Sequence, residues 1–194
     1  MLVGQEEPTD EVLARRFGDG DAAAFDLLVL RHRDAVYRFV RSRLGLQRAE
    51  AEDVTQDALV EVYRSLHRFE GRSRLRSWIL GVAANVCRSR RRSRSWGALR
   101  ESPDDEALRE LPDCSAGQEE ALARHELQAA VREAIDALGP EHRCVVTLRE
   151  VEGLSYQEIA EALQIPLGTV RSRLHNARAL LAQRLLPLMS REGS

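Results

Sequence analysis

The stretch GLSYQEIAEALQIPLGTVRSRL, residues 153–174, decides the fold of the C-terminal part of the chain. Its Ser155 and Glu158 have the S-x-x-E spacing of a capping box, in which two side chains satisfy backbone groups at the start of a helix. A helix is therefore predicted over 155–163. The apolar spacing beyond the turn predicts a second helix over 167–186. Two helices joined by a tight turn are expected here.

The second of these helices is predicted to present a polar face near its N-terminus. Thr169 is expected to cap it, and its apolar face is expected at Val170, Leu174, Ala177 and Leu181. The side chains that then point elsewhere are Arg171, Ser172, His175, Asn176 and Arg178. Such a helix fits the DNA major groove, where arginine can bond guanine through two hydrogen bonds. An ordinary helical hairpin with a solvated arginine face is the competing interpretation, and the cap, turn and polar face together favour a helix-turn-helix.

Helical periodicity covers most of the remaining chain, so the fold class is all-α. Further helices are predicted over 10–16, 21–44, 48–66, 74–94, 127–138 and 144–151. The stretch between the fourth and fifth of these is rich in Ser, Pro, Gly, Asp and Glu, a composition that does not form a core. We therefore expect two small helical domains, over 8–95 and 121–187, joined by an acidic flexible linker over 96–120.

The net charge of −2, from 29 basic and 31 acidic residues, hides an uneven distribution. Residues 71–100 hold nine arginines and no acidic residue, and residues 161–194 carry a net charge of +3. The intervening residues 101–126 carry −7. Two basic blocks separated by an acidic one keep nucleic acid as a candidate partner, although the overall balance argues against it.

The first basic block, together with Phe69 just before it, holds side chains that suit single-stranded DNA. The candidate residues are Phe69, Trp78, Asn85, Arg88 and Arg91. Arginine binds the phosphate backbone, and aromatic rings stack on exposed bases. On periodicity alone Trp78 is better interpreted as a core residue, and arginines also suit the C-terminus of a helix. Nine arginines without one acid exceed what a helix end requires, which favours a DNA surface.

A third feature is an acidic face on the helix predicted over 48–66. Asp53, Gln56, Asp57 and Glu61 fall along one side of it. Acidic residues at a helix N-terminus are common because they complement the helix dipole. Their continuation along the helix also suits contact with a basic protein partner.

Several classes of protein are disfavoured. No apolar run approaches the roughly 18 residues that span a bilayer, and the acidic N-terminus is not that of a signal peptide. Cys87, Cys114 and Cys144 are scattered, which favours a reducing cytoplasm and gives no zinc signature. Without paired carboxylates, a metal cluster or a glycine-rich phosphate loop, we expect no enzyme activity, metal, cofactor or small-molecule substrate.

Taken together, these segments resemble the extracytoplasmic-function group of bacterial sigma factors, in the sigma-70 family, and especially its envelope-stress (sigma-E-like) branch. The resemblance covers about residues 10–187. The stretch from 148 to 173 is similar to region 4 of that family, EDVTQD at 52–57 to region 2.2, and 78–85 to regions 2.3 and 2.4.

The resemblance implies a partner and roles that the residues alone do not give. Core RNA polymerase would be bound through its β′ clamp and β flap, with Asp53, Gln56, Asp57 and Glu61 on the docking helix. Promoter DNA would be melted and captured at the −10 element by Phe69, Trp78, Asn85, Arg88 and Arg91. The −35 element would be read by Arg171, Ser172 and His175, with Thr169, Arg173 and Arg178 nearer the phosphates.

The resemblance also implies how such a protein is restrained. No long autoinhibitory extension precedes residue 10, so a separate, membrane-bound anti-sigma factor is expected. Asn176 departs from the family pattern, which often has arginine there, and this leaves the −35 sequence open. A stand-alone helix-turn-helix regulator is the alternative function, and the docking helix followed by an arginine-rich aromatic helix argues against it.

Overall fold

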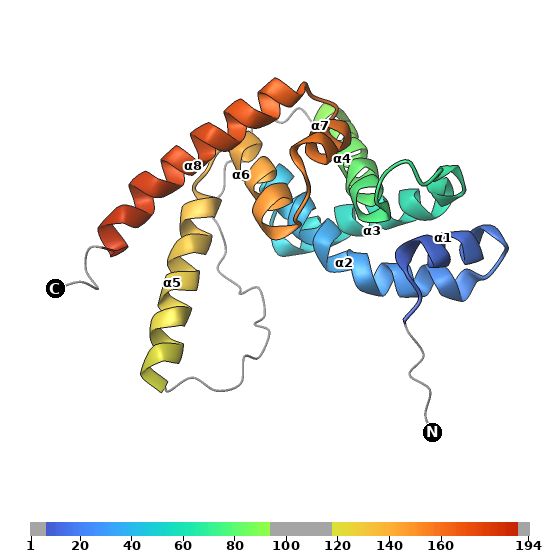
Figure 1. Ribbon diagram of the computed structural model, residues 1–194, viewed down its shortest axis with the longest axis horizontal. Coiled ribbons are helices and arrows are strands. Elements are labelled where there is room, and N and C mark those ends of the chain that lie inside the picture. Colours follow the sequence, from blue (N-terminus) through green and yellow to red (C-terminus); the bar gives the residue numbers. More distant parts are fainter. Residues whose placement is uncertain (1–6, 94–117, 190–194) are drawn as a thin grey trace.

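The computed structural model describes residues 7–93 and 118–189, with side chains described over 7–93 and 127–186 (Figure 1). Within these ranges the chain is helical and has no strand, which confirms the all-α fold. The elements are α1 (Asp10–Gly18), α2 (Ala22–Leu44), α3 (Arg48–Ser65), η1 (Leu66–Arg68), α4 (Leu75–Ser93), α5 (Gln118–Asp136), α6 (Pro140–Val146), η2 (Thr147–Val151), α7 (Tyr156–Leu163) and α8 (Leu167–Met189). No described helix is long and apolar enough to span a membrane. The linker expected over 96–120, with Cys114, lies outside the described residues apart from its last positions, which begin α5.

Local sequence signals account for several helix ends. The predicted capping box is present at the start of α7, where Ser155 Oγ accepts from the Glu158 N–H at 3.2 Å and the Ser155 N–H donates to the Glu158 carboxylate at 2.7 Å. α2 stops at Gly45, whose φ of 63° is a left-handed conformation that glycine adopts without strain. Pro140 begins α6, where its missing N–H leaves no helical hydrogen bond unmade.

The turn between α7 and α8 differs from the prediction in one detail. α7 ends at Gln164, which has a left-handed φ of 55°, and α8 begins at Leu167. Thr169 was expected to cap α8, but it lies inside the first turn, where its N–H donates to the Pro166 carbonyl at 2.9 Å. The cap prediction was wrong because the helix starts directly after Pro166.

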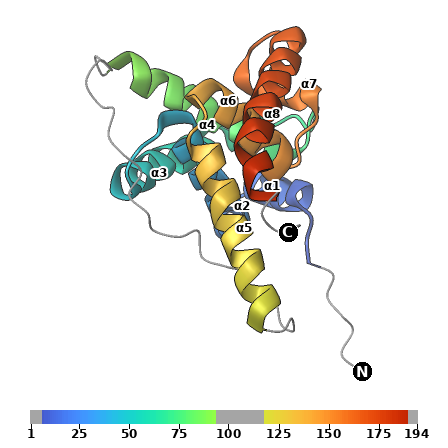
Figure 2. The same cartoon turned by 90° about the vertical axis from the view of Figure 1, so that its left-hand side faces the viewer.

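The helices form two groups, one before and one after residues 94–117. α2, α3 and α4 pack against one another, and α1 lies along α2. In the second group α6 and α7 pack on α8, and α5 packs on α8. Figure 2 shows that α5 extends away from the body of the molecule, whereas α6 and α7 pack on α2 and α4 of the first group.

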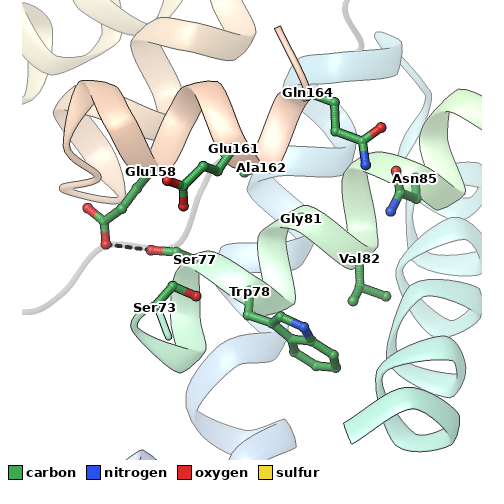
Figure 3. Close-up of a pocket in the computed structure, with 10 residues that line it drawn as sticks. All are labelled: Ser73, Ser77, Trp78, Gly81, Val82, Asn85, Glu158, Glu161, Ala162 and Gln164. Carbon is green, nitrogen blue, oxygen red and sulfur yellow. Dashed lines mark hydrogen bonds between the residues drawn. The ribbon is translucent and has the colours of Figure 1, made fainter. Parts of the chain in front are cut away.

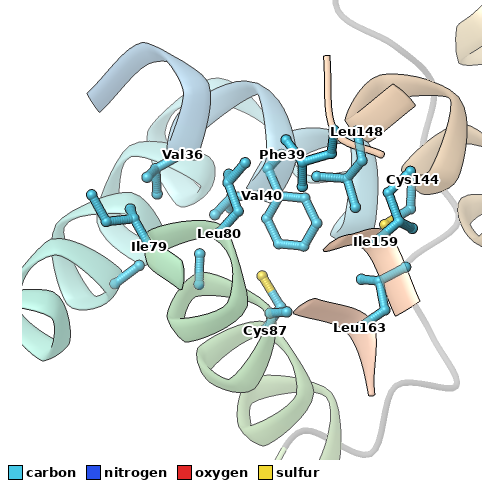
Figure 4. Packing of buried hydrophobic residues seen from close by; sticks show 14 of the residues in the cluster. Val36, Phe39, Val40, Ile79, Leu80, Cys87, Cys144, Leu148, Ile159 and Leu163 are labelled. Carbon is cyan, nitrogen blue, oxygen red and sulfur yellow. The ribbon is translucent and has the colours of Figure 1, made fainter. Parts of the chain in front are cut away.

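The two groups share one hydrophobic core. α4 packs on α7 and α2 packs on α6, and the side chains that gather between them come from both domains. They include Phe39, Cys87, Cys144, Leu148, Ile159 and Leu163 (Figure 4). α4 and α7 cross closely at Gly81, where an added Cβ would lie 3.6 Å from the Cα of Ala162. The linker prediction alone gave no reason to expect this packing.

Candidate nucleic-acid interface

The N-terminal part of α8 has the two faces that its sequence predicts. Val170, Leu174 and Ala177 are fully buried. Arg171 and His175 are exposed on the opposite side. An exposed arginine and imidazole near the N-terminus of a helix form a surface that fits the edges of base pairs in the major groove.

The other α8 residues of the predicted DNA face have partners within the molecule. The Ser172 hydroxyl donates to the Thr169 carbonyl at 3.1 Å. Arg173 pairs with Glu141 at 2.6 Å, and Arg178 pairs with Glu150 at 2.6 Å. These arginines therefore have carboxylate partners where the prediction expected phosphates.

The aromatic residues of the predicted −10 surface lie together on the N-terminal domain. The rings of Phe69 and Trp78 are 5.6 Å apart at their centroids, and both are half-buried. Trp78 packs at the margin of the core and retains some exposure. Asn85 lies further along α4 and is exposed.

Trp78 and Asn85 line an open pocket of about 250 Å³ (Figure 3). Its other α4 residues are Ser77, Gly81 and Val82, and Ser73 precedes the helix. The opposite wall comes from α7 and the turn that follows it, through Glu158, Glu161, Ala162 and Gln164. The pocket is therefore built by both domains, which the sequence did not indicate.

Arg88 and Arg91 also contact the C-terminal domain. Arg88 donates to the Asn85 side chain at 2.8 Å, to the Gln164 side chain at 2.7 Å and to the Leu163 carbonyl at 3.0 Å. Arg91 is exposed and lies 3.3 Å from Glu141. In this arrangement α7 covers the part of α4 that holds Arg88.

The predicted docking face on α3 is open. Asp53, Gln56, Asp57 and Glu61 are all exposed. Asp57 pairs with Arg90 of α4, on the same domain. An exposed row of acidic and amide side chains on one helix fits a basic partner surface.

Sequence reasoning missed an apolar part of this face. Val60 is 48% exposed, and Tyr63 is 49% exposed although its spacing from Leu59 and Leu66 predicts a buried position. The Tyr63 ring packs edge-on against Phe17 at 5.1 Å and Phe25 at 5.0 Å. The aromatic residues of α1 and α2 hold Tyr63 at the rim of the core, a contact between helices that a single-helix pattern does not contain.

Three carboxylates that the sequence analysis did not assign to the interface form ion pairs with arginines from other parts of the fold. The hydrogen bond from Arg74 holds the pKa of Glu158 well below its usual range. Burial alone would raise the pKa of Glu141, but the hydrogen bond and charge of Arg43, together with Arg173 and Arg91, lower it. Glu152 is the third, and its side chain is fully buried. The sequence did contain a signal for Glu158, the capping box with Ser155. That motif accounts for the Glu158 carboxylate by itself and gave no reason to expect its second partner, Arg74.

The described residues contain no group of three or more His, Cys, Asp or Glu side chains placed to hold a metal ion. Cys87 and Cys144 are free and buried in the shared core. Burial raises the pKa of each thiol to about 12. Such thiols stay protonated and react slowly while the core remains closed.

Comparison with known protein families finds a match in each half of the chain. The family model described as "Sigma-70 region 2" matches residues 28–97, and the model described as "Sigma-70, region 4" matches residues 128–181. The first range contains α3 and α4, and the second contains α7 and the N-terminal part of α8.

Similar full-length proteins agree with these matches. The chain is 35% identical to the RNA polymerase sigma-H factor of Pseudomonas aeruginosa, over 97% of this chain and 98% of that protein. It is 36% identical to the ECF RNA polymerase sigma-E factor of Escherichia coli strain K12, over 96% of this chain and 99% of that protein.

Two solved structures resemble the fold. One is CnrH in complex with the cytosolic domain of CnrY, with a TM-score of 0.61, 27% identity and coverage of 91% of this chain and 96% of that chain. The other is the sigma factor RpoE in complex with the anti-sigma factor NepR from Bartonella quintana, with a TM-score of 0.63, 26% identity and coverage of 83% and 96%.

Proposed function

Because this chain belongs to the sigma-70 family, as a sigma factor of the extracytoplasmic-function type, we propose how its residues divide the work of promoter-specific transcription initiation. The polymerase performs the chemistry, and this chain supplies binding energy at two promoter elements and a trap for melted DNA. The observation that carries the proposal is the presence, on one chain, of an exposed polar face on α8 and a pocket lined by Trp78 and Asn85 of α4.

Region 4 reads the −35 element through α8. Arg171 and His175 are exposed at the N-terminal end of the helix, where a recognition helix meets base edges. Ser172 lies beside them and supplies an adaptable hydroxyl. Arg173, Arg178 and Thr169 contact phosphates on either side, after Arg173 and Arg178 leave their carboxylate partners.

Region 2 melts the −10 element and holds an unstacked base. The Phe69–Trp78 pair offers an aromatic surface, and Asn85 offers an amide that can hydrogen-bond a base edge. Arg88 and Arg91 hold the backbone of the same strand. This division predicts that Asn85 acts after duplex binding, when the strands separate.

The helix α3 docks on the β′ clamp of core RNA polymerase in the cytoplasm. Asp53, Gln56, Asp57 and Glu61 form the polar part of the docking face, and Val60 and Tyr63 add apolar area that a partner would bury. Region 4 contacts the β flap of core RNA polymerase.

An anti-sigma factor restrains this chain. The support is the likeness to the sigma factor RpoE, whose structure was solved with the anti-sigma factor NepR. The partner bound to CnrH is the cytosolic domain of CnrY, which fits a membrane-bound regulator here.

Co-elution with core polymerase tests the proposed function against its alternative. The purified chain should elute with bacterial core polymerase on gel filtration and bind promoter DNA tightly only in that complex. A stand-alone helix-turn-helix regulator would instead elute apart from the polymerase and bind its duplex site by itself.

A further inference from the structure

One ion pair joins the proposed docking face to the helix that carries the proposed −10 surface. Asp57 of α3 pairs with Arg90 of α4, where the two helices pack against each other. Asp57 lies about one helical turn from Asp53 on one side and from Glu61 on the other, so it belongs to the same exposed row. The Asp57 side chain is 52% exposed and that of Arg90 is 40% exposed, which leaves both within reach of partners outside the chain.

Arg90 lies on a side of α4 that continues from the pocket. Val82 lines the pocket beside Trp78 and Asn85. Val86 and Arg90 follow Val82 at steps of four residues, which places all three on one side of the helix. Arg90 is therefore about two helical turns, or roughly 12 Å, beyond Val82. A DNA strand that leaves the pocket along this side of α4 would pass the Arg90 guanidinium.

Asp57 and such a strand would compete for Arg90. Arginine binds carboxylate and phosphate with the same planar group of N–H donors, so one guanidinium cannot make full contacts with both anions. A carboxylate beside the path of the strand also repels its phosphates, since like charges at short range raise the energy. Asp57 thus opposes a contact between Arg90 and DNA in two ways.

Asp57 gains a second partner under the proposed function. The docking face that includes Asp57 fits a basic surface on the β′ clamp of core polymerase. A clamp cation that pairs with Asp57 would compete with Arg90 for the same carboxylate. The docking site and the DNA surface would then share one charged group.

We propose that Arg90 is a further DNA-contacting residue, which Asp57 holds in the free chain and releases when core polymerase docks on α3. This inference rests on the proposed function, because it takes α3 as the docking helix and α4 as the −10 surface. Thermodynamic linkage makes the coupling reciprocal: docking strengthens the contact of Arg90 with DNA, and that contact strengthens docking by the same factor. An exposed ion pair is weak, so the factor is about two- to fivefold.

Affinity for core polymerase in the absence of DNA tests the competition for Asp57. Arg90→Gln removes the competing charge and should bind core polymerase about two- to fivefold more tightly than the parent chain. A merely structural role of Arg90 would not produce this gain, because a loss of packing or stability weakens binding. Arg92→Gln is the matched control, since Arg92 is exposed on the same helix and loses the same charge. Its affinity should stay close to that of the parent.

A double-mutant cycle shows whether the gain passes through Asp57. In an Asp57→Asn background, where docking is already weakened, Arg90→Gln should give no further gain. Fluorescence titration of labelled chain with core polymerase gives the four dissociation constants of the cycle. Equal affinities of Arg90→Gln and Arg92→Gln, or the same gain with and without the Asp57 carboxylate, would overturn the proposal.

The salt dependence of promoter binding by holoenzyme tests the DNA contact. Loss of one phosphate contact lowers the slope of log affinity against log salt concentration by about 0.7–0.9. Arg90→Gln should show this loss, whereas Arg90→Lys, which keeps a positive charge for the phosphate, should retain the slope of the parent. A slope for Arg90→Gln equal to that of the parent would remove Arg90 from the DNA surface and overturn the proposal.

The same measurements separate this inference from the proposed function. If the parent chain does not bind core polymerase, the proposed function and this inference are both wrong. If the parent binds core polymerase and directs transcription, but the cycle shows no coupling between Arg90 and Asp57, only this inference is wrong.

Discussion

At the scale of single residues, some of the proposed DNA-contacting side chains have carboxylate partners in the free chain, and others are exposed and available to DNA at once. Arg171 and His175 are exposed on α8, whereas Arg173 and Arg178 are paired with Glu141 and Glu150. Base reading therefore depends first on the exposed residues. The paired arginines contribute only after their carboxylates are displaced.

Substitution of Arg171 by alanine should lower both the affinity and the sequence specificity of binding to the −35 element. We expect a loss of about 1–3 kcal/mol in binding of holoenzyme to the promoter, because a bidentate contact to a base is removed. Competition between the native promoter and single-base −35 variants measures it. Arg184→Ala is the control, since Arg184 is exposed further along α8. Wild-type discrimination in Arg171→Ala would remove this residue from the reading face.

Substitution of Asn85 by alanine should act at strand separation. Asn85 lines the pocket with Trp78 and is exposed at the surface of α4. We expect the holoenzyme to bind duplex promoter almost as tightly as before and to form the open complex more slowly. Permanganate footprinting of unpaired thymines measures the rate of open-complex formation. An equal loss in both steps would show that Asn85 contacts the duplex and has no special role in melting.

At the scale of helices, the sequence predicted nearly every element because each carries its own signals. The apolar faces of α2 and α8 and the capping box of α7 are local patterns, and the structure contains all three. The predictions were wrong where a neighbouring helix or turn determines how a residue is buried or where a helix begins. Tyr63 is held at the rim of the core by Phe17 and Phe25, and the start of α8 is set by the turn before it.

The docking face of α3 yields a prediction at this scale. Asp53→Arg should abolish binding to core polymerase while the helical content stays the same, because Asp53 is exposed and its reversal opposes a basic partner surface. Gel filtration with core polymerase and circular dichroism measure the two effects. Asp26→Arg makes the same charge change at an exposed position of α2 and should bind normally. Unchanged affinity of Asp53→Arg would place docking elsewhere.

At the scale of the whole molecule, the packing of region 4 on region 2 could not be derived from the sequence. Glu152 follows no periodic pattern, and its partners Arg38 and Arg76 lie far away along the chain. Charge blocks suggested where DNA binds but not that acids of one domain neutralise arginines of the other. Such pairing depends on three-dimensional contact between distant segments, which periodicity and spacing do not encode.

The interdomain carboxylates make the stability of the whole molecule depend on pH. The pKa values of Glu158 and Glu141 are lowered from the ordinary value of 4.5. Their stabilisation is therefore present above about pH 4.5 and is lost as the pH falls through the lower values of the folded state. Burial lowers the pKa of His32 from 6.5, so its contribution is lost earlier on acidification.

Thermal unfolding followed by circular dichroism isolates the Glu158 contribution. The stability difference between wild type and Glu158→Gln should be full near neutral pH and should shrink on acidification below about pH 4.5. His32 is present in both proteins, so its effect cancels. Glu161→Gln, an exposed glutamate of the same helix, should differ little from wild type at any pH. A difference for Glu158→Gln that does not change with pH would contradict the assigned ion pair.

Run-off transcription tests the central claim most directly. Purified chain, bacterial core polymerase and the promoter upstream of the chain's own gene are combined, and each protein is also assayed alone. A specific transcript that requires both proteins is the predicted result, and its start would locate both promoter elements. If a set of candidate promoters gives no transcript and the chain does not co-elute with core polymerase, its role as a promoter-specificity subunit is contradicted.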